Sequence, residues 1–233
     1  MSAGSAVDPG MLSKVPLFEG LTSGQLEKVA SSLRPMSFPA HRDIMMTEQP
    51  GEAVYIILSG TLKVHVEQAD GRDVILALLG PGQTVGEMSI VDEVGRSASV
   101  LTLEDTKLLW MDRASFLACV TTIPRLSLNL MRVFSRRLRL ANIQIASLAT
   151  LDVYGRVARQ ILALADEYGK EAPEGGVYVP LSLTQSDLAD IVGASRVRVN
   201  QVLIDYRQRG YISVDQAHHV TVHDKTALEH RAQ

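Results

Sequence analysis

The sequence predicts an α+β protein whose β-rich N-terminal half is followed by a long helix and a mainly helical C-terminal half. Three observations predict this class. Short runs of β-forming residues alternate with glycine between residues 15 and 115, glycine and proline are absent from 125 to 150, and residues 152–222 combine a helix–turn–helix pattern with a hairpin. With 46% hydrophobic and 21% charged residues, the chain of 233 residues has the composition of a globular protein.

The N-terminus and the cysteine content exclude several classes of protein. No run approaches about 18 uncharged apolar residues, so no membrane-spanning helix is expected. The first ten residues have neither a basic start nor an apolar run, and we expect a flexible tail there rather than a signal peptide. Cys119 is the only cysteine, which excludes an intrachain disulfide, a cysteine-rich zinc site and a cysteine-ligated iron–sulfur cluster. We therefore expect a cytoplasmic protein without a metal site.

The β-rich half contains six runs that are typical of short strands. Turn signals at regular intervals favour an antiparallel barrel or sandwich, and the Asp-Gly pair at residues 70–71 predicts a hairpin. The predicted strands span residues 44–46, 53–58, 61–66, 74–79, 98–101 and 107–111.

A long helix is predicted to begin at Pro124, because proline suits the first turn of a helix. The pattern that follows favours a coiled coil between two copies of the chain. A long helix that packs on its own domain is the alternative. Apolar residues recur at the heptad spacing of three and four at Met131, Phe134, Leu138, Ala141, Ile145 and Leu148.

The C-terminal part predicts a winged helix–turn–helix. Three helices each follow a residue that can cap a helix N-terminus, namely Asp152, Thr184 and Ser195. Gly193 and Gly210 end the second and third of these helices. Residues 211–222 then resemble a hairpin, and this order of elements is that of a winged helix–turn–helix.

A glycine-rich segment, residues 82–89, carries one carboxylate and precedes a guanidinium. Arg96 lies nine positions after Glu87. An arginine can neutralise a phosphate with paired hydrogen bonds, a carboxylate can accept from a ribose hydroxyl, and backbone N–H groups near Gly86, Ser97 and Ala98 can cradle phosphate oxygens. On this chemistry alone, an ion pair between Glu87 and Arg96 at the surface is the favoured explanation.

The order and spacing of these residues favour a phosphate-binding site over a surface ion pair. The segment resembles the phosphate-binding cassette of cyclic-nucleotide-binding domains, which has Gly-Glu-hydrophobic-small followed by Arg, a small residue and Ala. Residues 57–64 resemble the strand–turn–strand signature of the same domain. The helix–turn–helix behind a long helix completes a resemblance to the catabolite activator (CRP/FNR) family of bacterial transcription regulators, over residues 12–223.

The resemblance implies a division of the chain into three parts. Residues 12–123 would form a cyclic-nucleotide-binding β-roll of the jelly-roll type, and residues 124–150 a dimerisation helix. Residues 151–233 would form a winged helix–turn–helix DNA-binding domain.

The resemblance also implies a ligand and the residues that bind it. Glu87 would bind the ribose 2′-OH, and Arg96 and Ser97 the cyclic phosphate. In members that respond to cyclic AMP, a Thr-Ser pair on the long helix touches adenine; the matching residues here are Ala141 and Asn142. Cyclic AMP is therefore the expected effector, and cyclic GMP or another ligand stays open. The complete expected ligand set is Gly86, Glu87, Met88, Ser89, Arg96, Ser97, Ala98, Arg137, Ala141 and Asn142.

The third C-terminal helix is the expected recognition helix. Between Ser195 and Gly210 the chain has four arginines and one aspartate, so this segment is basic although the whole chain has a net charge of −3. A solvated helix face is the alternative. The best-known cyclic-AMP activator of the family opens this helix with Arg-Glu and has a further Arg one turn later; the matching residues here are Arg196, Val197 and Gln201. The expected DNA-binding set is Thr184, Gln185, Ser195, Arg196, Val197, Arg198, Asn200 and Gln201.

Together these observations predict a homodimeric, DNA-binding transcription regulator controlled by a cyclic nucleotide. Its expected partners are a palindromic operator in double-stranded DNA and RNA polymerase. A regulator of the same architecture that is active without nucleotide, or that answers another ligand, is the alternative. An enzyme that processes the nucleotide is the alternative of a different class, and the sequence contains no nucleophile–base pair that supports it.

Overall fold

A computed structural model describes residues 7–68 and 73–233 of the chain. These residues divide into two compact units, one built on residues up to 66 and 76–138, and the other on residues 67–68, 73–75 and 139–233. The boundary falls inside the long helix, whereas the sequence suggested three consecutive parts; that division stays a prediction. Among the described residues no single helix is long and apolar enough to cross a membrane.

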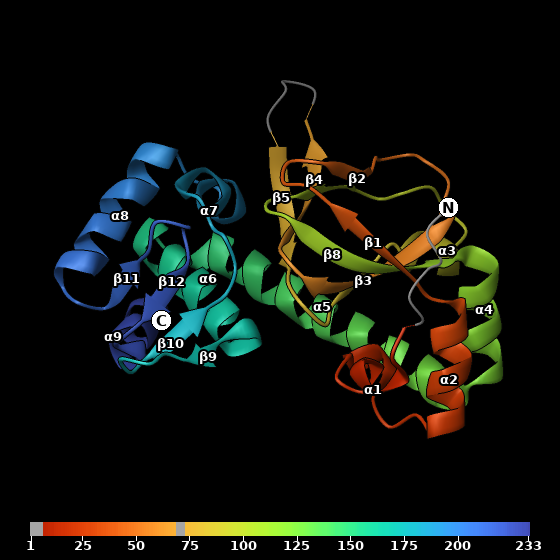
Figure 1. Ribbon diagram of the computed structural model, residues 1–233. Helices are drawn as coiled ribbons and strands as arrows, with labels where there is room; N and C mark the ends of the chain where they lie inside the picture. The colour runs from red at the N-terminus through yellow and green to blue at the C-terminus, as the bar shows by residue number, and fades with distance from the viewer. Residues whose placement is uncertain (1–6, 69–72) are drawn as a thin grey trace. The chain divides into compact units, whose positions relative to one another are not determined.

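Two antiparallel four-stranded sheets form the body of the first unit (Figure 1). One has the order β1 (Arg34–Phe38), β8 (Thr106–Asp112), β3 (Ala53–Ser59) and β6 (Thr84–Val85). The other has the order β2 (Asp43–Met45), β7 (Ser99–Thr102), β4 (Leu62–Glu67) and β5 (Asp73–Leu79). Both sheets contribute to one apolar core, and this confirms the predicted β-roll. The core includes Ile57, Leu62, Val85, Val100 and Leu108.

All six predicted strands are present, each within one residue of its predicted ends. β4 and β5 pair as the predicted hairpin requires, but its Asp-Gly turn at 70–71 lies outside the described residues. Two further strands, β1 and β6, were not predicted. β6 has two residues, and β1 contains a proline, which is tolerated because β1 is the edge strand of its sheet.

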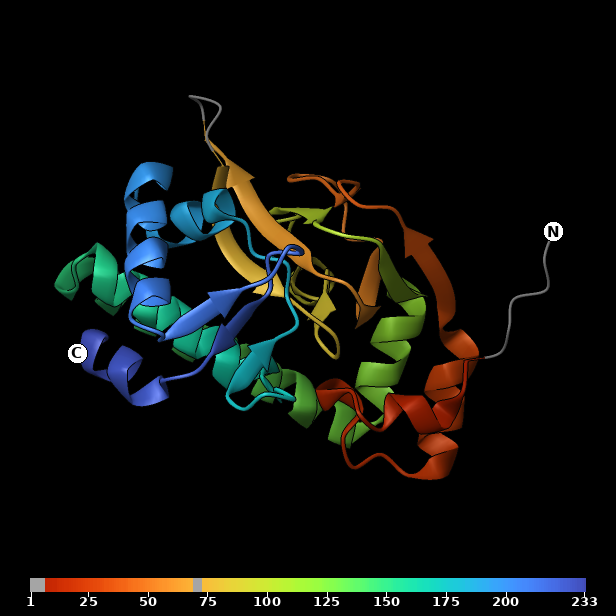
Figure 2. The ribbon, with the colours of Figure 1, turned by 60° about the vertical axis from the view of Figure 1, so that its left-hand side comes forward.

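Short helices cover the outer face of the sheet that contains β3 and β8, and the sequence analysis missed all of them. They are α1 (Pro9–Leu12), the 3₁₀ helix Pro16–Phe18, α2 (Ser23–Ser32), α3 (Met88–Val91) and α4 (Arg113–Thr122). The tail prediction is wrong for residues 9 and 10, because Asp8 caps α1 and Leu12 is fully buried. Figures 1 and 2 show α2 and α4 side by side, and Lys28 Nζ donates to Thr122 Oγ1 between them at 3.0 Å.

The long helix α5 (Pro124–Thr150) begins at the predicted proline and has 27 residues. Its first turns pack on the first unit through Leu126 and Leu130, which are buried. The buried Asn129 Nδ2 also donates to the carbonyls of Leu17 at 3.1 Å and Glu19 at 2.7 Å. Packing on the same domain, the alternative considered for this helix, therefore holds for its N-terminal turns.

Further along α5, most of the heptad positions are exposed. Met131, Leu138 and Ile145 are 57%, 64% and 65% exposed, and Leu148 is also exposed. Phe134 is the exception, since it packs partly against the apolar core of the first unit. A seam of large apolar side chains is thus open to solvent in the single chain.

The second unit is a winged helix–turn–helix, as predicted. It contains α6 (Val153–Tyr168), α7 (Gln185–Val192), α8 (Arg196–Gln208) and a C-terminal helix, α9 (Lys225–Arg231), which the sequence analysis missed. Its four-stranded sheet has the order β11 (Ile212–Val214), β12 (Val220–Val222), β10 (Val177–Val179) and β9 (Lys170–Glu171). The strands β11 and β12 are the predicted hairpin.

Local sequence signals explain where these helices begin and end. Asp152, Thr184 and Ser195 each accept a backbone N–H at the start of α6, α7 and α8, as predicted. Gly193 has a φ of +61° at the end of α7, a left-handed conformation that glycine adopts without steric cost. Thr184, Gly193 and Ser195 therefore determine where α7 begins, where it ends and where α8 begins, and so encode the turn between the two helices.

Candidate functional site

The candidate ligand site lies where strand β6 runs through a glycine turn into α3. Gly86 has a φ of +92°, and a Cβ atom there would lie 2.7 Å from both the Ala53 carbonyl oxygen and Arg96 Nη1. Only glycine allows this backbone conformation and the close approach of Arg96 at once. The turn places Glu87 at the N-cap of α3 and Ser89 inside it, and both side chains are buried.

Arg96 is buried, with 7% of its surface exposed, and its hydrogen bonds are with neutral groups. Nη1 donates to the Gly86 carbonyl oxygen at 2.7 Å and to Ser89 Oγ at 2.8 Å, and Nη2 donates to the Ala53 carbonyl oxygen at 2.8 Å. Burial lowers the pKa of this guanidinium below its ordinary value, while nearby Tyr55 and Glu87 oppose that shift. The side chain is thus a buried cation without a carboxylate partner among the described residues.

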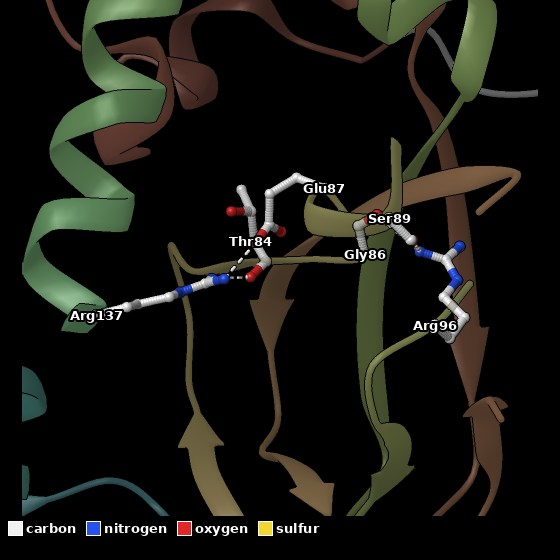
Figure 3. Close-up of polar contacts among 6 residues, drawn as sticks. All are labelled: Thr84, Gly86, Glu87, Ser89, Arg96 and Arg137. Carbon is white, nitrogen blue, oxygen red and sulfur yellow. Dashed lines mark hydrogen bonds and ion pairs between the residues drawn. The ribbon is translucent and has the colours of Figure 1, made fainter. Parts of the chain in front are cut away.

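Glu87 is 1% exposed and pairs with Arg137 on α5, not with Arg96 (Figure 3). Arg137 Nη1 donates to Glu87 Oε1, and Nη2 donates to the carbonyl oxygen of Thr84. A surface ion pair between Glu87 and Arg96, which residue chemistry alone favoured, is therefore wrong. Both groups are buried, and the helix supplies the partner of the carboxylate.

Several polar atoms around this ion pair have no hydrogen-bond partner among the described residues. They are Glu87 Oε2, Arg137 Nε and Thr84 Oγ1, and each is shielded from solvent. Burying a polar atom without a partner is unfavourable, so such atoms in a native fold call for an explanation. A second acceptor oxygen of Glu87 that lacks a donor is compatible with a ligand hydroxyl.

The other expected ligand residues differ in their accessibility. Met88 and Ser97 are exposed, Gly86 is partly exposed and Ala98 is buried. Ala141 and Asn142 lie on α5, one turn beyond Arg137, and both are exposed. These two residues belong to the second unit.

The candidate DNA-reading face is on α8. Its apolar stripe, Val199, Val202, Leu203 and Tyr206, is buried as predicted. Arg196, Val197 and Gln201 are exposed, and Val197 is 70% exposed. Arg198 Nη1 donates to Gln201 Oε1 at 3.1 Å. Thr184, also in the expected set, shares a capping box with Asp187.

Comparison with known protein families identifies the domains that contain the candidate ligand site and the candidate DNA-reading face. Residues 35–122 match the family model of the cyclic nucleotide-binding domain, and residues 155–231 match that of the Crp-like helix-turn-helix domain. The chain belongs to the CRP/FNR family. It is therefore a DNA-binding transcription regulator with a cyclic-nucleotide-binding domain, and the hypothesis of a nucleotide-processing enzyme is set aside.

Three relatives illustrate the match to the CRP/FNR family. The CRP-like cAMP-activated global transcriptional regulator of Mycobacterium tuberculosis is 36% identical over 95% of this chain and 98% of its own. The Cyclic AMP receptor protein of Thermus thermophilus is 32% identical over 84% of this chain and 88% of its own. The solved structure of FixK2 from Bradyrhizobium japonicum shares the fold, with a TM-score of 0.77, 20% identity, and coverage of 86% of this chain and 98% of that one.

Some residues of this CRP/FNR-family site were not found from the sequence. The Thr84 and Ala53 carbonyl oxygens bind Arg137 and Arg96, and a backbone contact of this kind leaves no mark in a side-chain motif. Tyr55 lies beside Arg96, and burial raises the pKa of its hydroxyl while the arginine opposes the shift. Its place on β3, opposite Val85 of β6, follows only from strand register.

Proposed function

We propose that this CRP/FNR-family regulator is a homodimer controlled by cyclic AMP, which binds through Glu87 and Arg96. The observation that carries the proposal is the buried Arg96 guanidinium, which has three neutral hydrogen-bond acceptors and no carboxylate partner among the described residues. A buried cation is costly unless a charge compensates it. The phosphate of a cyclic nucleotide supplies that charge, with the five N–H donors of arginine suited to its oxygens.

Glu87 would bind the ribose of the same nucleotide. Its Oε2 atom is buried and lacks a donor among the described residues, and a ribose 2′-OH can donate to it. Arg137, which donates to Oε1, would hold the carboxylate in place while Oε2 accepts from the ribose hydroxyl. Ala141 and Asn142 would face the base; asparagine both donates and accepts hydrogen bonds, whereas alanine does neither.

The names of the relatives support cyclic AMP as the effector. The regulator of Mycobacterium tuberculosis is called cAMP-activated, and the chain aligns with it over nearly the whole length of both proteins. A regulator of this architecture that acts without nucleotide, or with another ligand, is the competing assignment.

The exposed seam of α5 supports a homodimer. Met131, Leu138 and Ile145 are large apolar side chains at heptad positions, and a second copy of the helix would remove them from water. Two copies related by a two-fold axis would place two α8 helices on a palindromic operator. RNA polymerase as a further partner and a location in the cytoplasm are parts of the same proposal.

Calorimetric titration of the purified protein with cyclic AMP, cyclic GMP and cyclic di-GMP tests the assignment. We expect cyclic AMP to bind tightest and to increase affinity for operator DNA selected from a random pool. Tighter binding of another nucleotide would transfer the effector assignment to it. DNA binding that is equal with and without every nucleotide would favour the regulator that needs none.

A further inference from the structure

Two arginines from different helices of the second unit stack on one tyrosine. The guanidinium carbon of Arg198, on α8, lies 5.4 Å from the ring centroid of Tyr154, and that of Arg231, on α9, lies 5.6 Å from it. Tyr154 is in the first turn of α6, so three separate helices meet at this ring. We call Tyr154, Arg198 and Arg231 the tyrosine–arginine cluster.

The ring is held in place by its own partners. Tyr206, which is fully buried, donates from its hydroxyl to the Tyr154 carbonyl oxygen at 2.8 Å. The two rings also pack edge to face, with centroids 6.0 Å apart and an interplanar angle of 78°. Tyr154 is therefore a fixed platform, and a cation over its face gains from the electrons of the ring.

The two arginines are not neutralised within the described residues. Neither forms an ion pair with a carboxylate there, and Arg198 donates instead to the neutral Gln201. Two other exposed cations of this unit do have such partners: Arg209 pairs with Asp205 at 2.9 Å, and Lys225 with Asp166 at 2.7 Å. Arg231 lies in the last turn of α9, where the helix dipole favours a positive charge. That position does not by itself require the side chain to stack on Tyr154.

The cluster lies at the side of the DNA-reading face. At about 100° per residue around a helix, Arg198 falls between the exposed Val197 and Gln201 on one side and the buried Val199 and Val202 on the other. A recognition helix in the major groove has a phosphate backbone along each side, and arginines there bind phosphates. The guanidinium carbons of Arg198 and Arg231 lie 5.4 and 5.6 Å from the same ring centroid, so Arg231 is near Arg198 at this edge of the DNA-reading face.

We propose that Arg231 of the C-terminal helix, together with Arg198, binds a backbone phosphate of the DNA, and that Tyr154 is the positioning residue for both. The inference rests on DNA binding through α8. It extends the DNA interface beyond the helix–turn–helix to α9, at a residue that the recognition motif does not include. Because a phosphate is present at every base step, this interaction contributes affinity and not sequence preference.

The test is the salt dependence of binding to a random-sequence DNA duplex, measured by fluorescence anisotropy with the whole protein. We expect Arg231→Gln to weaken binding at low salt and to reduce the slope of log K against log salt by about 0.9 for each phosphate that it no longer neutralises. Lys225→Gln removes the same charge from the same helix and should leave the slope unchanged. Tyr154→Leu should reduce the slope, whereas Tyr154→Phe retains the ring and should match the wild type.

The outcomes separate this inference from DNA binding itself. If the wild type fails to bind any DNA duplex, DNA binding through α8 fails and the inference with it. If the wild type binds and Arg231→Gln has an unchanged slope, only the inference is overturned, even where the variant melts at a lower temperature. A smaller decrease in affinity at the operator than on random DNA would also contradict a backbone contact, as would equal decreases for Lys225→Gln and Arg231→Gln.

Discussion

Arg96 is a buried cation whose three hydrogen bonds all end on uncharged oxygens. Glu87, nine residues earlier, is buried too, yet it pairs with Arg137 from a different element. The two residues of one motif therefore have separate surroundings: the guanidinium has no anionic partner among the described residues, and the carboxylate retains an acceptor oxygen without a donor there. This separation suits a ligand that carries both a phosphate and a hydroxyl.

Replacement of Arg96 tests the anion site. Arg96→Leu should weaken cyclic AMP binding more than tenfold, because a charge-assisted hydrogen bond contributes about 1.5–3 kcal/mol. Calorimetric titration measures the change. Arg113→Leu is the control, since Arg113 is a partly exposed cation that pairs with Glu93. Unchanged affinity in a folded Arg96→Leu protein would remove Arg96 from the site.

The exposed residues of α8 predict the operator. Arg196 should read a guanine, whereas Val197 can contact a thymine methyl but cannot accept a hydrogen bond from cytosine, and Gln201 can read adenine. Each altered preference should be worth about 1–3 kcal/mol per base pair. Selection from random DNA at one salt concentration tests this. Recovery of the full consensus that an Arg-Glu…Arg helix would select, with equal stringency throughout, would show that Val197 and Gln201 do not set specificity.

Among the elements, α4 shows how a short helix is secured by its cap. Asp112 ends β8 and accepts hydrogen bonds from the backbone N–H and the hydroxyl of Ser115, each at 2.9 Å. These bonds lower the pKa of the Asp112 carboxyl below its ordinary value. The helix then buries Phe116 and Cys119 in the apolar core. Asp112 thus begins a helix that packs against the apolar core of the first unit.

Asp112→Ala should lower the free energy of unfolding by about 1 kcal/mol at pH 7. Because the folded-state pKa is depressed, this contribution is present above the unfolded pKa of about 3.8 and is lost as pH falls through the folded value. The difference between wild type and variant should therefore shrink near pH 3. Urea denaturation at both pH values measures it. Asp112→Asn, which can cap without titrating there, should show little pH dependence, and a difference for Asp112→Ala that is equal at both pH values would contradict the assignment.

For the whole molecule, the long helix is the element whose surface a second copy would cover. Its N-terminal turns are buried in the first unit, but its heptad positions from Leu138 onward are exposed. A single chain leaves this apolar seam in water, which is unfavourable in proportion to its area. Association along the seam would bring together two DNA-reading helices for one palindromic operator.

Leu138→Asp should dissociate the proposed dimer, because it places a charge where two apolar side chains would meet. Sedimentation velocity at micromolar concentration measures the change. Ile143→Asp is the matched control, since Ile143 is also exposed on α5 but lies outside the heptad positions. A wild-type protein that stays monomeric with and without nucleotide would exclude the dimer. Equal effects of both substitutions would exclude this seam.

The winged helix–turn–helix and the strands were predictable because their signals are local. Thr184, Gly193 and Ser195 each act on the backbone within four residues, so the α7–α8 turn is encoded where it forms. Length alone does not explain the missed helices: α3 has four residues, but α2 has ten, more than the eight of the predicted α7, and it begins with a capping box of Thr22 and Gln25 that could have indicated it. The C-terminal helix α9 has seven residues, and its capping residue Asp224 is the local signal that could have indicated it.

The motif around Gly86, Glu87 and Arg96 was recognisable from sequence order, and so was the family to which it belongs. Tertiary structure decided that Arg137 is the partner of Glu87, and that Tyr154 holds Arg198 and Arg231. Glu87 and Arg137 are 50 positions apart in the sequence, and Tyr154 and Arg231 are 77 positions apart. Helix and turn signals act over a few residues, whereas the pairing of buried charges depends on which elements the core brings together, and no local pattern encodes that.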